Sequence, residues 1–121
     1  LHFRVEFKYE ERMPAIHDLQ GYMDALGASF DAERACGRSA TLQYLFSGSV
    51  IGACHAVIED GALSVAEGKH PAPTATVIAD FDLWLRITTY QLDALMAYQE
   101  GLFAVEGDVE TLIETDDWFT R

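Results

Sequence analysis

Four histidines and two cysteines are the side chains best suited to metal binding or nucleophilic catalysis in this chain. Zinc sites usually draw ligands from closely spaced pairs such as HExxH or CxxC. Neither spacing occurs here, so the sequence predicts no metal site. The residues are His2, His17, His55, His70, Cys36 and Cys54.

Cys54 and His55 are neighbours in a segment with the pattern of a strand. Consecutive strand residues point to opposite faces, so these two side chains cannot form a thiolate–imidazole pair within that strand. We therefore interpret His55 as a structural residue, exposed or hydrogen-bonded. Two cysteines cannot build a disulfide framework, and we expect both to be reduced.

Carboxylates are the third group with catalytic potential. Asp80 and Asp82 could act as an acid–base pair, but side chains two positions apart on a helix diverge, and both suit a helix N-terminus. Helix capping is the favoured interpretation. The acidic C-terminal segment lacks the spacing and turn glycine of an EF-hand, so we interpret it as a solvated face. Its residues are Glu106, Asp108, Glu110, Glu114, Asp116 and Asp117.

Composition and missing motifs exclude several functions. The sequence has no GxGxxG, P-loop or GxSxG motif, so no cofactor is expected. Twenty acidic residues against eight Lys and Arg give a net charge of -12, which disfavours nucleic acid as a partner. No run approaches the ~20 apolar residues needed to span a bilayer, and no signal-peptide core is visible. We expect a cytoplasmic protein without stable membrane insertion.

The elements that must position these residues show strand and helix patterns in turn. Apolar and polar residues alternate from Leu1 to Tyr9, which predicts a strand over residues 1–12. Pro14 and an apolar stripe ending at Phe30 predict a helix over residues 14–30. The later pattern predicts strands at 40–46, 50–58, 63–66 and 74–79, a helix capped by Asp80 or Asp82, a helix at 92–99, a strand at 102–105 and a helix capped by Asp108.

This order of elements predicts one α+β domain over residues 1–121. Its sheet is expected to be mainly antiparallel, with five strands, or six if residues 1–12 join it, and with helices covering one face. An exposed strand edge with an apolar face invites pairing. The strand from Leu1 to Tyr9 is therefore also a candidate homodimer interface.

Four segments between residues 40 and 115 share their order and spacing with a known family. They are an aromatic strand, a hairpin, a strand that enters a helix and a closing segment: Leu42–Phe46, Val57–Val65, Ala75–Asp82 and Gly101–Asp108. In these segments the chain resembles the sterol carrier protein type 2 family, small α+β domains that bind fatty acyl chains, acyl-CoA and sterols in an apolar tunnel. The resemblance implies an apolar cavity between the sheet and the helices.

Two features depart from the family pattern. The family usually places a glycine between its two middle helices, where this chain has Ile87-Thr88-Thr89-Tyr90-Gln91 and one extra residue. The strand predicted at residues 1–12 also lies outside that pattern. We expect the junction between the two helices to have its own geometry here.

The resemblance implies a set of lipid-binding side chains on both sides of the cavity. The sheet would contribute Leu42, Tyr44, Phe46, Cys54, Ala56, Ile58, Phe103 and Val105. The helices would contribute Trp84, Ile87, Leu92, Leu95, Met96, Leu112, Ile113, Trp118 and Phe119. Without the resemblance, each of these residues is ordinary core, because stripes at helical spacing occur in every packed domain.

Three functions follow from this interpretation. The first is non-enzymatic binding and transfer of a hydrophobic ligand, such as a fatty acid, acyl-CoA or sterol-like molecule. The second is a small enzyme that cyclises or isomerises a polyketide or terpenoid in the same pocket, with Tyr44, His55, Asp80 or Tyr90 as polar anchors. The third is an accessory or dimerisation module whose core contains no cavity.

Overall fold

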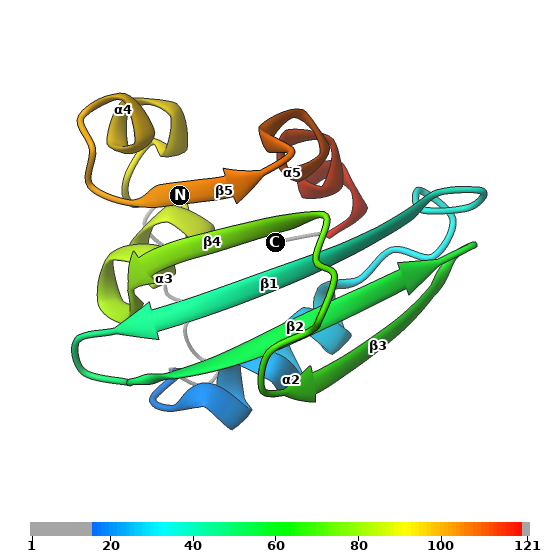
Figure 1. Cartoon of the computed structure of the whole chain (residues 1–121), viewed down its shortest axis with the longest axis horizontal. Coiled ribbons are helices and arrows are strands. Elements are labelled where there is room, and N and C mark those ends of the chain that lie inside the picture. Colours follow the sequence, from blue (N-terminus) through cyan, green and yellow to red (C-terminus); the bar gives the residue numbers. More distant parts are fainter. Residues whose placement is uncertain (1–15, 120–121) are drawn as a thin grey trace, which may run out of the picture.

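Five strands form one sheet in the computed structural model, which describes residues 16–119 (Figure 1). The strands lie in the order β3-β2-β1-β4-β5. Their bounds are Ser39–Ser47 for β1, Gly52–Glu59 for β2, Ala62–Glu67 for β3, Ala75–Asp80 for β4 and Ala104–Gly107 for β5. Each corresponds to a strand that the sequence pattern predicts, with its ends shifted by one or two residues.

The sheet is mixed, not purely antiparallel, because β1 and β4 run parallel. The pairs β1-β2, β2-β3 and β4-β5 are antiparallel, as predicted. Because β2 occupies one edge of β1, β4 joins at the other edge, and it runs parallel because the chain after β3 returns to Thr41, near the start of β1, before β4 begins. Thr74 opens that pairing: its backbone N–H donates to Thr41 O at 2.8 Å, and its hydroxyl oxygen accepts from Thr41 N at 3.0 Å.

Aspartates begin the helices, in agreement with the capping interpretation. The Asp80 carboxylate accepts from Leu83 N at 3.0 Å, and that of Asp108 accepts from Thr111 N at 3.1 Å. These hydrogen bonds confirm both residues as caps, whereas Asp82 lies inside the first turn. The helices are α2 at Leu19–Ser29, α3 at Phe81–Thr88, α4 at Ala94–Gln99 and α5 at Val109–Thr115, followed by the 3-10 turn η1 at Asp116–Trp118.

The first described helix begins later than the predicted range of 14–30. Asp18 has extended backbone angles, and its carboxylate accepts from Gly21 N at 2.8 Å, so α2 starts at Leu19. The strand predicted at residues 1–12, and with it the predicted homodimer contact, lies outside the described residues. Both stay predictions.

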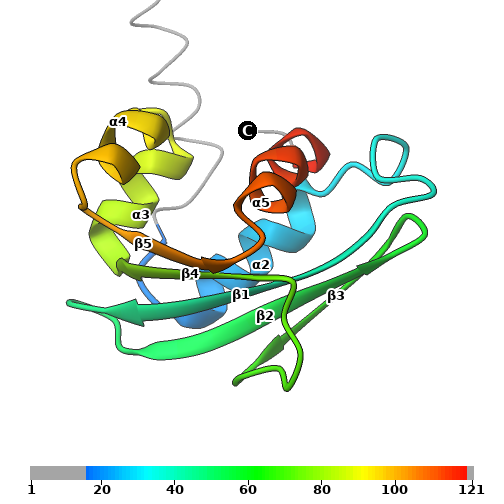
Figure 2. The same ribbon diagram turned by 45° about the horizontal axis from the view of Figure 1, so that its top comes forward.

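The helices lie on one face of the sheet, as Figure 2 shows. Side chains at alternate positions of the strands meet them: Leu42, Tyr44 and Phe46 of β1 are buried on this face. The next strand continues the same face with its own alternate residues, because β1 and β2 pair in register. Its buried residues are Cys54, Ala56 and Ile58.

The opposite face of the sheet holds His55, so the histidine points away from the helices. Its Nδ1 donates to Gly68 O at 2.8 Å, and its ring centroid lies 5.2 Å from that of His70. Gln43 is buried on this face too, where its amide accepts from His70 N at 2.7 Å and donates to the Thr76 hydroxyl at 3.3 Å. These contacts agree with a structural role for His55.

Two further observations concern residues 16–119. In that range, none of the helices has the length and apolar character required to cross a membrane. Across the same residues, His, Cys, Asp and Glu side chains do not assemble into groups of three or more that could hold a metal ion.

Candidate functional site

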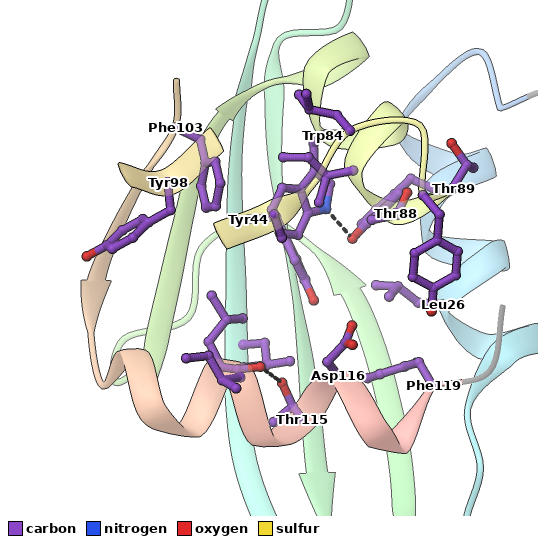
Figure 3. A pocket seen from close by; sticks show the side chains of 18 of the residues that line it. Leu26, Tyr44, Trp84, Thr88, Thr89, Tyr98, Phe103, Thr115, Asp116 and Phe119 are labelled. Atoms are coloured by element: carbon purple, nitrogen blue, oxygen red, sulfur yellow. Dashed lines mark hydrogen bonds between the residues drawn. The ribbon is translucent and has the colours of Figure 1, made fainter. Parts of the chain in front are cut away.

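A pocket of about 690 Å³ opens between the helix layer and the sheet (Figure 3). Its wall comes from α2, β1, α3, the junction between α3 and α4, α4 itself, β5, and the α5–η1 segment. Residues far apart in the sequence therefore meet at this pocket. The pocket has the size and the mostly apolar lining of a small-molecule site.

The floor of the pocket is aromatic and aliphatic. Leu42 and Tyr44 reach it from β1, and Trp84 and Ile87 from α3. The Trp84 ring packs edge-on against Phe103, with centroids 5.4 Å apart. Each of these side chains is wholly or partly buried, so an occupant would exchange water for apolar contact along this wall.

A buried polar contact fixes the aromatic cluster. Trp84 Nε1 donates to Tyr22 Oη at 2.8 Å, and the Tyr22 ring packs against Tyr44 at a centroid distance of 5.3 Å. Burial, with a smaller contribution from Tyr44, raises the pKa of Tyr22 well above its usual value, although the hydrogen bond from Trp84 opposes the shift. Tyr22 therefore stays a neutral phenol, and its hydroxyl holds the indole in place rather than acting as a base.

The junction between α3 and α4 forms one edge of the pocket, and here the chain departs from the family pattern. Tyr90 has φ of 63°, in the left-handed region that glycine adopts without strain. The backbone N–H groups of Gln91 and Leu92 both donate to Arg86 O, at 2.8 and 3.1 Å, and close this turn. Tyr90 thus takes the backbone conformation for which a glycine would be expected, and its side chain is 72% exposed at the pocket edge.

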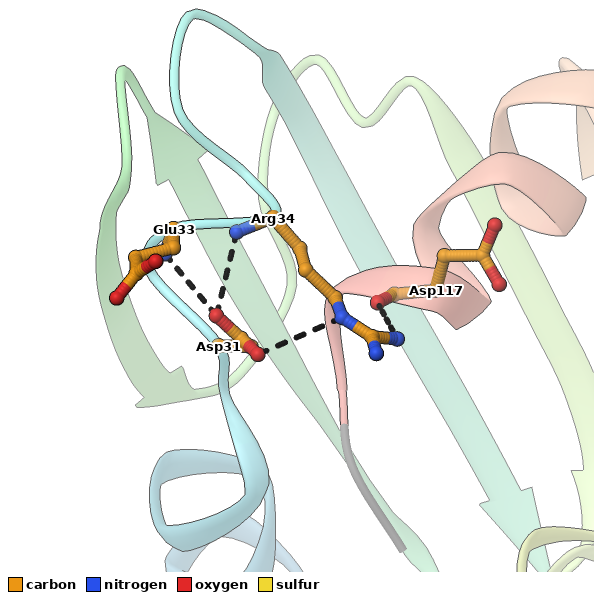
Figure 4. A network of polar contacts seen from close by, with 4 residues as sticks. All are labelled: Asp31, Glu33, Arg34 and Asp117. Atoms are coloured by element: carbon orange, nitrogen blue, oxygen red, sulfur yellow. Dashed lines mark hydrogen bonds and ion pairs between the residues drawn. The ribbon is translucent and has the colours of Figure 1, made fainter.

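The opposite edge is the α5–η1 segment. Contacts with the loop at residues 30–38 hold this segment in place. Asp31 N donates to Trp118 O at 2.7 Å, and Arg38 forms an ion pair with Glu114 at 2.7 Å. Arg34 also links the two segments, because it contacts the Asp31 carboxylate at 3.5 Å and donates to Asp117 O at 3.3 Å (Figure 4). Together these contacts set the position of this wall relative to the sheet.

The charges at the pocket are negative. Asp93, which caps α4, and Asp116 of η1 both line it. None of the described lining residues is Lys, Arg or His. In residues 16–119 the Lys and Arg side chains lie elsewhere: Arg34 and Arg38 in the loop with their ion-pair partners, Lys69 after β3, and Arg86 exposed on α3.

Most side chains in the predicted lipid-binding set line this pocket, although ligand contact itself stays a prediction. Those that line it are Leu42, Tyr44, Trp84, Ile87, Leu92, Leu95, Phe103, Val105, Leu112, Ile113 and Phe119. The others do not: Phe46, Cys54, Ala56, Ile58 and Trp118 are buried in the core beyond the pocket, and Met96 is 52% exposed. Five of these six apolar side chains are core residues, and Met96 lies on the surface of the short helix α4.

The wall supplied by α2 was missing from the predicted set. Tyr22, Ala25, Leu26 and Ser29 all line the pocket. The apolar stripe of this helix is visible in the sequence, but it does not say which part of the sheet the helix covers. The junction residues Thr88 to Gln91 were also absent, and their polar character was the available signal.

The four polar anchors considered for an enzyme do not converge. Tyr44 and Tyr90 line the pocket. His55 lies on the other face of the sheet, and Asp80 is engaged as the cap of α3.

Several solved structures have a fold similar to that of this chain. A palmitated sterol carrier protein 2-like 2 from Aedes aegypti aligns over 78% of this chain and 84% of its own, with 19% identity and a TM-score of 0.61. The chain has a sterol carrier protein 2-like fold. A ubiquinone synthesis protein, UbiJ-SCP2, shares it over 92% of this chain and 86% of its own, at 17% identity and a TM-score of 0.54.

A larger enzyme contains a similar structure. The inverting sec-alkylsulfatase Pisa1 from Pseudomonas sp. aligns over 84% of this chain with 22% identity and a TM-score of 0.75. The chain spans only 16% of the length of that sulfatase. By sequence, no protein-family model and no curated protein matches the chain significantly.

Proposed function

We propose that this protein binds a hydrophobic small molecule in the pocket between the sheet and the helices, and carries it without chemical change. The observation behind this proposal is the pocket of about 690 Å³, whose floor is formed by Leu42, Tyr44, Trp84 and Phe103. The apolar cavity implied by the resemblance would be this space. Ligand sites of this kind are concave, mostly apolar and equipped with few polar groups.

Burial of the ligand's apolar part would drive binding. At about 0.8 kcal/mol per buried methylene, enclosing ~10 methylenes contributes ~8 kcal/mol, which corresponds to a Kd of about 1 μM before the entropy cost of association weakens it. Such a pocket separates ligands that differ by one methylene by only ~1 to 3 kcal/mol. We therefore expect loose selectivity for chain length.

Two proteins with the same fold have names that support this proposal. One of them is a palmitated protein, and another takes part in ubiquinone synthesis by its name. Palmitate is a long-chain lipid. At identities of 17% and 19%, these likenesses support a hydrophobic ligand as a class and leave its identity to experiment.

A pocket-filling variant tests the proposal. Ala25 lines the pocket from α2, so the Ala25→Phe variant should occupy its space, whereas Ala28 is exposed on the same helix and outside the lining. Binding of the neutral dye Nile red is measured by fluorescence, and native mass spectrometry of the purified protein shows whether a ligand is bound. We expect Ala25→Phe to weaken dye binding about tenfold or more, and Ala28→Phe to leave it unchanged.

Two results would reject the proposal. One is the absence of any bound lipid or dye at micromolar concentration with the folded wild-type chain. The other is equal weakening by Ala25→Phe and Ala28→Phe, which would place the dye elsewhere. Circular dichroism of both variants checks that they are folded.

A second candidate follows from the sulfatase likeness: the sequence is a ligand-binding domain of a longer enzyme that acts on alkyl compounds. The TM-score of 0.75 against part of that enzyme favours it. An antibody against this sequence, applied to a denaturing gel of the source cells, would detect a polypeptide several times longer than 121 residues. A band at the size of 121 residues would contradict this candidate and leave the first one standing.

A further inference from the structure

Exposed apolar side chains gather on one part of the helix layer. Of the seven large apolar side chains that are exposed among the described residues, six lie between residues 90 and 113. Scattered single residues of this kind are ordinary, whereas a group of them on neighbouring elements is not. Five of the six form what we call the α4–α5 apolar patch, with exposed fractions between 39% and 65%: Leu95, Met96 and Tyr98 of α4, Leu102 after that helix, and Ile113 of α5.

The patch continues the wall of the pocket. Leu95, Tyr98 and Ile113 also line the pocket, so α4 and α5 both present exposed apolar side chains at its edge. The strand β5 connects the two helices, which stand at its opposite ends (Figure 1). A small molecule inside the pocket would leave Met96 and Leu102 exposed, because these two residues lie outside the lining. The patch therefore has the character of a surface for a larger partner.

The charge of the segment that carries this patch is negative. Asp93 and Glu100 stand at the two ends of α4, and both are exposed. Arg38 offsets one further carboxylate, that of Glu114, through their ion pair. From residue 87 to residue 119 the sequence has no Lys, Arg or His, but eight acidic residues: Asp93, Glu100, Glu106, Asp108, Glu110, Glu114, Asp116 and Asp117.

From this combination of apolar surface and negative charge we infer that the α4–α5 apolar patch binds a basic amphipathic helix of a partner protein. Apolar side chains of that helix, spaced by three and four residues, would contact Leu95, Met96 and Ile113. Its Lys and Arg side chains would lie along both flanks, where they meet Asp93 and Glu100. The inference goes beyond the proposed function, because this contact requires no ligand in the pocket.

The same charge argues against two other occupants of the patch. In a symmetric dimer each subunit contributes the same surface, so two copies of this acidic segment would face and repel each other. An anionic lipid surface would repel the segment too, and a zwitterionic one would supply no net positive charge to it. A basic helix complements both the apolar side chains and the carboxylates.

A synthetic peptide tests this inference without knowledge of the natural partner. The probe is a fluorescent peptide of Leu and Lys whose leucines recur every three or four residues, so that its helix has one apolar and one basic face. One control peptide has the same composition in an order without an apolar face, and a second has Glu in place of Lys. Fluorescence anisotropy at about 0.15 M salt should give a micromolar dissociation constant for the probe, about tenfold weaker binding of the reordered peptide and no binding of the acidic one.

Two matched pairs of variants locate the contact on the protein. The double variant Met96→Gln with Leu102→Gln removes apolar side chains of the patch that lie outside the pocket lining, and should weaken binding of the Leu/Lys peptide about tenfold. Its control is Ile51→Gln, which removes an exposed apolar side chain between β1 and β2 and should leave binding unchanged. Glu100→Gln should weaken binding about threefold, whereas Glu59→Gln changes the net charge equally at the end of β2 and should have no effect.

Three results would overturn the inference. The first is equal affinity for the Leu/Lys peptide and its reordered control, and the second is equal weakening by the patch variants and their controls. The third is cosedimentation of the protein with phosphatidylcholine vesicles without any binding of the Leu/Lys peptide, which would assign the patch to a lipid surface. Circular dichroism checks that each variant is folded. Because Nile red binding tests the proposed function separately, failure of one leaves the other standing.

Discussion

At the scale of single residues, Tyr90 is the clearest case of local strain. It adopts φ of 63° although it is not glycine, and it stands where the helices α3 and α4 meet. A left-handed conformation costs an L-residue roughly 1–2 kcal/mol. Tyr90 is 72% exposed and lines the pocket, so a ligand bound there would lie beside its ring.

Replacing Tyr90 by glycine should therefore stabilise the protein and weaken binding. We expect Tyr90→Gly to raise the free energy of unfolding by about 1 kcal/mol in urea denaturation, since relief of strain exceeds the added freedom of the unfolded chain. Nile red binding should weaken in the same variant. Tyr90→Ala is the control: it removes the ring but keeps the strain, so it should bring no gain in stability. A less stable Tyr90→Gly variant would disprove the strain argument.

The two cysteines differ in reactivity because their surroundings differ. Cys54 is fully buried, and this burial, with Glu67 nearby, raises the pKa of its thiol to about 12. Cys36 is exposed. At pH 8, iodoacetamide should therefore modify Cys36 in the native protein and spare Cys54. Mass spectrometry of the peptides measures this; a Cys36→Ser variant that still takes up one equivalent would contradict it.

The same pKa shift makes stability depend on alkaline pH. The folded state holds the Cys54 proton more tightly than the unfolded state, whose thiol has a pKa near 9.0. The stabilisation is therefore complete below pH 9 and is lost as the pH rises toward 12. In urea titrations from pH 8 to 10.5, Cys54→Ala should show a shallower decline in stability than the wild type. Parallel declines would refute this assignment.

At the scale of elements, the turn from β5 into α5 packs closely against the backbone before β4. Gly107 has φ of 89°, and a Cβ there would lie 2.5 Å from Thr74 O, the backbone atom that accepts from Asp108 N at 3.0 Å. The Thr74 oxygen is a backbone atom, so it can move away from a Cβ only if the chain itself shifts. This one glycine couples the start of α5 to the sheet, and thereby positions the pocket wall that α5 supplies.

Two glycine variants isolate this steric effect. Gly101 also has a positive φ, of 77°, but a Cβ there would meet nothing within 4 Å. We expect Gly101→Ala to lower the free energy of unfolding by about 1 kcal/mol and Gly107→Ala by about 3 kcal/mol, because the second adds a backbone clash to the same conformational cost. Urea denaturation measures both. Equal losses would show that the structure relaxes around Gly107.

At the scale of the whole molecule, ligand binding in the pocket should raise the stability of the folded state. A molecule that binds only the folded state stabilises it by RT ln(1 + [L]/Kd), or about 2.7 kcal/mol at one hundred times Kd. For a chain of 121 residues we expect the thermal midpoint to rise by roughly 10 °C when Nile red is present at one hundred times its Kd. The pocket-filled Ala25→Phe variant should shift by far less. An equal shift in both proteins would indicate binding outside the pocket.

Local patterns along the chain predicted most of the fold. Asp80 and Asp108 were identifiable as caps, and Val57–Val65 as a hairpin, because caps and tight turns depend on neighbouring residues. Strand periodicity also predicted that Leu42, Tyr44 and Phe46 share one face. These features can be predicted without knowledge of distant contacts. The resemblance to sterol carrier proteins was recognised from the same local features.

What the sequence determined by itself is thus the set of elements, their caps and turns, and the apolar face of each. Only the tertiary structure decided that β4 lies parallel to β1, that α2 supplies a wall of the pocket, and that Phe46 and Ile58 are core rather than lining. The physical reason is that periodicity specifies which side of an element is dry, whereas a pocket depends on which dry sides meet and where they fail to fill the space between them.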